Sequence, residues 1–113
     1  MPSPERDELL ARLGELSDLN HAGHVMAWDQ QVMMPSRGGA ARGDALGTIQ
    51  RLHHDRLVAP QLGALLDAAG PGDELLVRAV RREHDRASRV PGDLAEAIAR
   101  AGSAGYEVWL QAR

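Results

Sequence analysis

The chain has 113 residues, of which 43% are hydrophobic and 26% are charged, and its formal net charge is −3. This length allows one domain with a modest core, and the negative charge gives no electrostatic reason to expect nucleic-acid binding. Two tryptophans and one tyrosine are the only aromatic residues. Leucine, alanine, valine and methionine must therefore supply the core, which favours packed helices over a sheet.

The chain contains no cysteine, so disulfides, thiol catalysis and cysteine-bound zinc are excluded. The first seven residues are charged and contain prolines, and the apolar segment of a secretory signal does not follow them. No run approaches the roughly 20 apolar residues that a membrane-spanning helix needs. We therefore expect a cytoplasmic protein that does not enter a membrane.

The first predicted helix is long for a chain of this size. Ser3, Pro4 and Glu5 provide a capping residue, a proline for the first helical position and an acid for the first turn. Apolar and small residues then recur mostly at spacings of three and four. They are Leu9, Leu13, Leu16, Leu19, Gly23, Met26 and Met33. The pattern predicts a helix from Pro4 to about Val32, roughly 43 Å long at 1.5 Å per residue.

Two shorter helices are predicted next. Residues 35–39 contain a proline and two glycines, which should interrupt the helical pattern. A second helix should run from Ala40 to Leu57, because Pro60 prevents its continuation. Its expected apolar face is Leu46, Ile49, His53 and Leu57. Pro60 can itself open a third helix that carries Leu62, Leu65, Leu66 and Ala69 and stops at Gly70-Pro71-Gly72.

Two further helices complete the predicted fold. Asp73 is expected to cap a fourth helix, and Asp93 a fifth. The expected inner side of the fourth is Leu76, Val77, Val80, His84 and Ala87. The expected inner side of the fifth is Leu94, Ile98, Gly102, Gly105, Tyr106 and Trp109. Helical register continues to Arg113 without a stop signal, which predicts a truncated last helix and a longer parent polypeptide.

These elements together predict an all-α fold, an antiparallel bundle of about five helices that forms a single domain over residues 1–113. The fourth helix also carries an arginine run that is most often a solvated face, although it could contact phosphates. The run is Arg78, Arg81, Arg82, Arg86 and Arg89.

The histidines offer weak evidence for metal chemistry. His21 and His24 lie about one turn apart on the first helix and could share a metal ion. A catalytic zinc on a helix usually takes histidines at i and i+4, and the residue four positions after His21 is Val25. We therefore expect structural or exposed histidines, with a small metal-binding bundle as an alternative. His84 is expected to be a core histidine that bonds to a neighbour.

The stretch Trp28-Asp29-Gln30-Gln31-Val32-Met33-Met34-Pro35, with Gly38-Gly39-Ala40-Ala41-Arg42 after it, departs most from generic helical patterning. A buried acid without a partner would be costly, so Asp29 should accept hydrogen bonds from Arg42 or from backbone amides of the glycine loop. Trp28 is expected to fill a gap between helices. We hypothesise that an Asp29–Arg42 pair fixes the turn at residues 35–39.

This stretch resembles the N-terminal region of the carboxypeptidase Taq family, a group of helical zinc metallocarboxypeptidases. The resemblance continues in order through 61–66, through 76–91, and through Trp109 with Ala112-Arg113, so that it covers nearly the whole chain. One departure is His84, where the family often has an aromatic residue. The family's zinc-binding His-Glu-x-x-His motif does not occur in the 113 residues.

The resemblance implies the N-terminal part of an enzyme that removes single C-terminal residues from peptides with zinc or cobalt. The family's catalytic and metal-binding residues lie downstream, so none is assigned here. Structural roles are assigned to Trp28, Asp29, Pro35, Arg42 and Trp109. The implied partners are the rest of the parent polypeptide, a peptide substrate and a second subunit, and the segment would line or cap the substrate cleft. The alternative is a free-standing helical interaction module without catalysis.

Overall fold

A computed structural model describes residues 3–113 of the chain. Within these residues it contains five helices and no strand, which confirms the predicted all-α fold. The helices are α1 (Pro4–Val32), α2 (Gly39–Leu57), α3 (Pro60–Asp67), α4 (Glu74–Ala87) and α5 (Gly92–Ala112). No helix in this part of the chain combines the length and apolarity that crossing a membrane requires.

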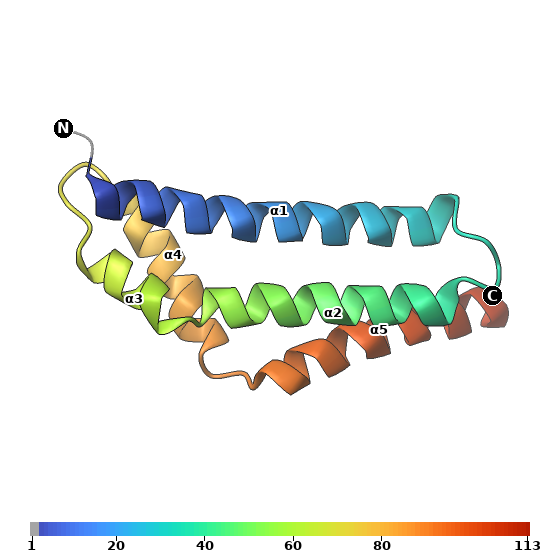
Figure 1. Ribbon diagram of the computed structural model, residues 1–113. Helices are drawn as coiled ribbons and strands as arrows, with labels where there is room; N and C mark the ends of the chain where they lie inside the picture. The colour runs from blue at the N-terminus through green and yellow to red at the C-terminus, as the bar shows by residue number, and fades with distance from the viewer. Residues whose placement is uncertain (1–2) are drawn as a thin grey trace.

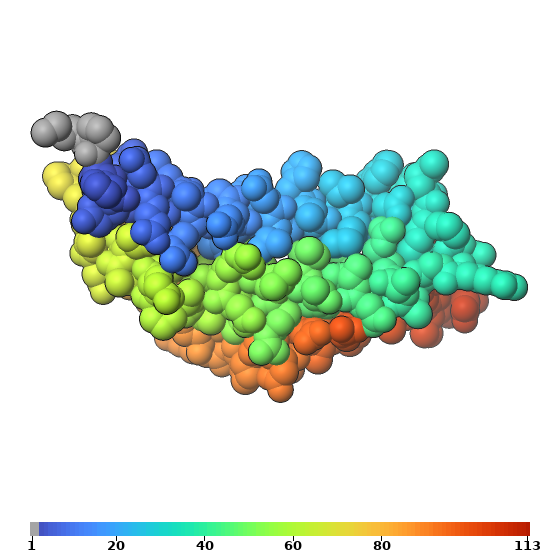
Figure 2. Space-filling model, in the orientation of Figure 1, coloured from blue at the N-terminus to red at the C-terminus, as the bar shows by residue number. Residues whose placement is uncertain are grey.

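The three longest helices run side by side along a molecule that measures 55 × 26 × 20 Å. Helix α1 runs antiparallel to α2, and α5 lies along the other side of α2 (Figure 1). Helices α3 and α4 lie near the N-terminal end of α1. In the space-filling view the three long helices form successive bands, with α2 in the middle (Figure 2). Helix α2 is therefore the central element, because it packs against both α1 and α5.

The helix ends follow the sequence signals in part. Ser3 caps α1, since its Oγ accepts a hydrogen bond from the Arg6 amide at 3.3 Å. Asp73 is the residue before α4, but its side chain does not cap that helix and instead accepts from Arg6 Nε at 2.9 Å. Helix α5 begins one residue before Asp93, which therefore lies in its first turn. The Asp73 contact ties the start of α1 to the start of α4.

The apolar core is small and lies where α1 meets α3. Its buried side chains are Leu9, Leu16, Leu62 and Leu66. Five partly buried residues pack around them, namely Leu13, Leu57, Leu65, Val77 and Val80. Most of these positions belong to the predicted apolar stripes of the first, third and fourth helices. Met33 and Leu76 belong to the same predicted stripes but are exposed.

Glycines set the contact between α2 and α5. Gly39, Gly43 and Gly47 recur every fourth residue and therefore share one face of α2. A Cβ atom on Gly43 would lie 3.4 Å from Ser103 Oγ, and one on Gly47 would lie 2.9 Å from Arg100 Cγ. The absence of side chains at these glycines thus allows α5 to approach α2 closely, with Ser103 and Arg100 of α5 lying against the α2 backbone.

The predicted inner side of α5 is wrong for this chain. Ser103 is the buried residue of that helix. The expected apolar and glycine positions are exposed, namely Leu94, Ile98, Gly102, Gly105 and Trp109, and Tyr106 is partly exposed. The prediction assumed that the apolar face of α5 would meet the neighbouring helix, but the face that α2 offers consists of glycines and the Asp44 carboxylate.

Candidate functional site

An ion pair joins the end of α1 to the beginning of α2. Arg42 Nη2 donates to Asp29 Oδ2 at 2.7 Å, and Arg42 Nη1 donates to the Met26 carbonyl oxygen at 2.7 Å. Both charged side chains are mostly buried, with exposed fractions of 21% for Arg42 and 29% for Asp29. The structure therefore forms the pair that the sequence suggested, on the two sides of the α1–α2 turn (residues 33–38).

The backbone of the α1–α2 turn is also closed by short-range hydrogen bonds. The amides of Met33 and Met34 both donate to the Asp29 carbonyl oxygen at 2.9 Å. The Gly38 amide donates to the Pro35 carbonyl oxygen at 2.9 Å. Asp29 therefore serves the turn twice, through its carboxylate and through its backbone carbonyl.

The expectation that Trp28 fills a gap between helices is wrong for this chain. Its side chain is 59% exposed, and Val25 and Val32 on the same side of α1 are exposed as well. Helix α2 packs on a different side, where a Cβ on Gly23 would lie 3.7 Å from Ile49 Cγ2. Trp28 comes five positions after Gly23, which places the two residues about 140° apart around the helix.

Trp109 is also largely exposed, near the end of α5. Its ring lies 5.9 Å from that of Tyr106, centroid to centroid, and the guanidinium of Arg113 lies 5.1 Å from the Trp109 ring centroid. These contacts all lie within one or two helical turns of each other. The indole therefore makes local contacts and does not join α5 to another helix.

Two histidines connect the ends of α2 and α4 reciprocally. His84 Nδ1 on α4 donates to the carbonyl oxygen of Leu57, the last residue of α2, at 2.6 Å. His54 Nε2 on α2 donates to the carbonyl oxygen of Ala87, the last residue of α4, at 3.1 Å. The last carbonyls of a helix lack amide partners within it. His84 satisfies that of Leu57, and His54 adds a second donor to that of Ala87, which also accepts from the Val90 amide at 3.0 Å. The prediction that His84 bonds to a neighbour is confirmed.

His53 lies on α2 next to His54 and is partly buried. Burial lowers the pKa of His53, and the neighbouring His54 lowers it further. A histidine whose pKa is lower in the folded state binds more protons when unfolded. Its contribution to stability is therefore present above the unfolded pKa of about 6.5 and is lost as the pH falls through that value toward the folded pKa.

We accordingly expect urea midpoints to be lower at pH 5.5 than at pH 7.5. Replacing His53 with glutamine should reduce this difference, because glutamine cannot take up a proton. Urea unfolding of both proteins at both pH values measures the effect. An equal pH difference in the two proteins would show that His53 does not contribute to it.

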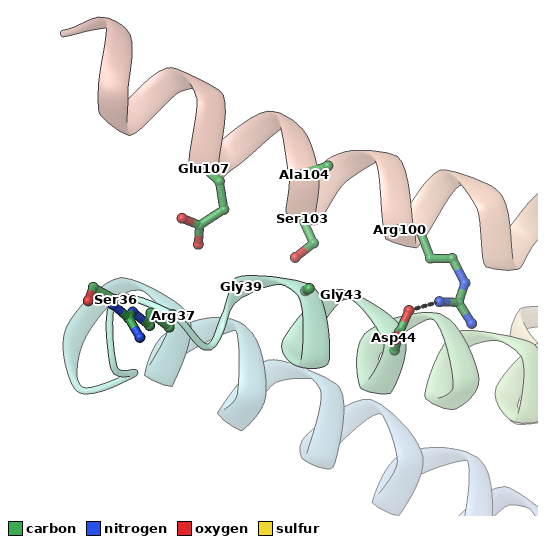
Figure 3. A pocket seen from close by; sticks show the side chains of 10 residues that line it. Ser36, Arg37, Gly39, Gly43, Asp44, Arg100, Ser103, Ala104 and Glu107 are labelled. Carbon is green, nitrogen blue, oxygen red and sulfur yellow. Dashed lines mark hydrogen bonds and ion pairs between the residues drawn. The ribbon is translucent and has the colours of Figure 1, made fainter.

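A cavity of about 490 Å³ lies between the beginning of α2 and the second half of α5 (Figure 3). The side chains of Ser103 and Glu107 point from α5 toward α2, and Asp44 pairs with Arg100 across the cavity. Glu107 Oε1 is buried without a hydrogen-bond partner. Its carboxylate carbon would lie 3.0 Å from a Cβ on Gly39, so the acid lies against the first residue of α2.

The cavity side chains do not form a nucleophilic catalytic arrangement. Ser103 Oγ accepts a hydrogen bond from Gln30 Nε2 at 2.9 Å, and no histidine bonds to it. A serine nucleophile needs a base within hydrogen-bond reach. This polar cluster was not predicted from the sequence, although the spacing of Gly39, Gly43 and Gly47 is a signal that another element approaches α2.

Comparison with known proteins assigns the family. The model of the carboxypeptidase Taq (M32) metallopeptidase family matches residues 8–113. The chain belongs to this family. The resemblance read from the sequence is therefore confirmed.

Two relatives show how much of a longer protein the chain covers. Thermostable carboxypeptidase 1 of Thermus thermophilus is 30% identical over 122 aligned positions, which cover 99% of this chain and 24% of that protein. Thermostable carboxypeptidase 1 of Pyrococcus furiosus is 27% identical, over 94% of this chain and 22% of that protein. No solved structure matches the chain. The chain thus spans about a quarter of the length of these relatives.

M32 proteins are metallopeptidases, so a catalytic member needs side chains that bind a metal ion. Among residues 3–113, no group of three or more His, Asp or Glu side chains is placed to hold one. His21 and His24 are both exposed on α1. A structural or catalytic zinc ion takes at least three side-chain ligands. The described residues therefore do not fit the catalytic metal of the family.

Proposed function

We propose that this chain forms the N-terminal helices of an M32 metallocarboxypeptidase, a hydrolase that releases C-terminal amino acids from peptides. One observation carries the proposal: the family model matches residues 8–113, while the chain spans only 24% and 22% of two thermostable carboxypeptidases. Roughly three quarters of such a protein would remain to supply the metal ligands and the general base.

In this proposal the chain contributes shape and support and does not itself cleave bonds. Residues outside this chain would hold the zinc or cobalt ion. When bound, the ion would polarise the scissile carbonyl and activate water. The residues of the chain would line or cap the substrate cleft. The Asp29–Arg42 pair and the two histidine contacts support this role, because they fix how α1, α2 and α4 lie relative to one another.

The exposed apolar side chains favour this proposal over a free-standing interaction module. Large apolar residues are exposed on both α1 and α5, including Trp28, Val32, Ile98 and Val108. A protein that works alone rarely leaves such surfaces uncovered. By analogy with the family, we also propose a cytoplasmic location, a homo-oligomeric parent protein and a peptide substrate.

An activity comparison tests the proposal. The purified 113-residue chain should release no amino acid from a blocked dipeptide, even with zinc or cobalt added. A polypeptide extended from the source gene through a downstream His-Glu-x-x-His motif should release it, and a chelator should abolish the activity. Hydrolysis by the 113-residue chain alone, or a stop codon directly after Arg113, would contradict the proposal.

A further inference from the structure

Helix α5 carries an uncharged face along its whole length, and that face is open to solvent. We call it the outer face of α5. It consists of Leu94, Ala97, Ile98, Ala101, Gly102, Gly105, Val108, Trp109 and Ala112, all of which are exposed. Ile98 is 60% exposed and Val108 is 66% exposed. Such a face on a helix of a globular protein is normally buried.

The opposite side of α5 is polar and packs on α2. Ser103 is 5% exposed, and Arg100 and Glu107 lie against the α2 glycines. Arg100 also pairs with Asp44 of α2. The helix therefore turns its charged side inward and its apolar side outward. This orientation is the reverse of the usual one and leaves the outer face of α5 without a covering element in this chain.

Two glycines on the outer face of α5 point to a close neighbour. A Cβ on Gly102 or Gly105 would meet nothing within 4 Å. Glycine inside a helix destabilises it relative to alanine, so nothing in this chain accounts for these two residues. On α2 the glycines at 39, 43 and 47 are explained by the approach of α5. By the same physical argument, Gly102 and Gly105 are explained if another backbone approaches α5.

We propose that the outer face of α5 is a docking surface for a helix from the part of the M32 polypeptide that this chain does not span. This inference rests on the proposed function. The relatives are about four times as long as the chain, so their remaining length can supply such a helix. The residues of the face are themselves uncharged, and the charge at its end, Arg113, is stacked on the Trp109 ring. The small residues of the face suit close contact between helices.

The experiment places the same substitution in two proteins. The first is the 113-residue chain, and the second is a chimera in which this chain replaces the matching region of Thermus thermophilus thermostable carboxypeptidase 1. In the chain alone, Gly105→Ala should raise Tm by about 4 °C, because the methyl group meets open space and favours the helix. In the chimera it should lower Tm, because the methyl group separates two packed helices.

A charged substitution provides a matched pair. Val108→Asp lies on the outer face of α5, and Gln111→Asp lies on the same helix but off that face. In the chimera, Val108→Asp should lower Tm by several degrees more than Gln111→Asp, since it buries an unpaired charge. In the chain alone the two substitutions should differ little in Tm. Differential scanning fluorimetry measures all of these proteins.

Three results would overturn the inference. One is a chimera that does not fold with the unaltered chain, and another is equal effects of Val108→Asp and Gln111→Asp in the chimera. The third is a dimer of the 113-residue chain that Val108→Asp dissociates, because the occupant would then be a second copy. Peptide hydrolysis by the chimera is recorded separately. Gly105→Ala could raise Tm in the chain alone and lower it in a chimera that is inactive. That result would support the docking surface while counting against the proposed function.

Discussion

Replacing Leu62 with alanine is expected to lower the free energy of unfolding by about 3 kcal/mol, within the usual range for a buried leucine. Leu62 has no exposed surface, and only three other large apolar side chains in the described chain are buried, Leu9, Leu16 and Leu66. Small domains are stable by only about 5–15 kcal/mol. One cavity in so small a core should therefore remove a large share of the total stability.

Urea unfolding followed by circular dichroism measures this loss. The matched control is Leu75→Ala, because Leu75 is 78% exposed on α4 and its truncation should change stability by less than about 0.5 kcal/mol. Equal effects of the two substitutions would mean that the leucine cluster between α1 and α3 is not the stabilising core.

The helices and this core could be predicted because their signals are local. Pro60 marks the start of α3, and the spacing of Leu62, Leu65 and Leu66 gives its inner side. The Asp29–Arg42 pair could also be anticipated, because an acid in an aliphatic segment needs a partner and few are near in sequence. In each case the deciding interactions lie within one helix or between elements that follow one another closely.

The orientation of α5 could not be predicted from its own pattern. Periodicity shows which residues share a face of a helix, but it does not show which neighbour covers that face. The inner side is decided by the α2 glycines, more than 50 residues earlier in the chain. The contact of His54 with the Ala87 carbonyl oxygen, across 33 residues, is of the same kind, since no local signal connects the two positions.

The α1–α2 turn is the second place where a large effect is expected. Arg42→Ala should lower the free energy of unfolding by about 2 kcal/mol, because hydrogen bonds to charged groups contribute about 1.5–3 kcal/mol. Asp29→Ala should cost less, about 1 kcal/mol, because Arg42 would keep its bond to the Met26 carbonyl oxygen. Both estimates lie below the middle of that range, because both side chains retain some exposure to solvent.

A double-mutant cycle separates the ion pair from the other contacts of Arg42. The Asp29→Ala/Arg42→Ala protein should be more stable than the sum of the single losses predicts, with a coupling energy of about 1 kcal/mol. Arg37→Ala is the control, because Arg37 is an exposed arginine in the same turn and should change stability little. Unchanged stability in both single variants would reject the hypothesis that this pair fixes the turn. A loss in Arg42→Ala alone would assign the effect to the Met26 carbonyl contact, because the guanidinium would then stabilise the end of α1 without its carboxylate partner.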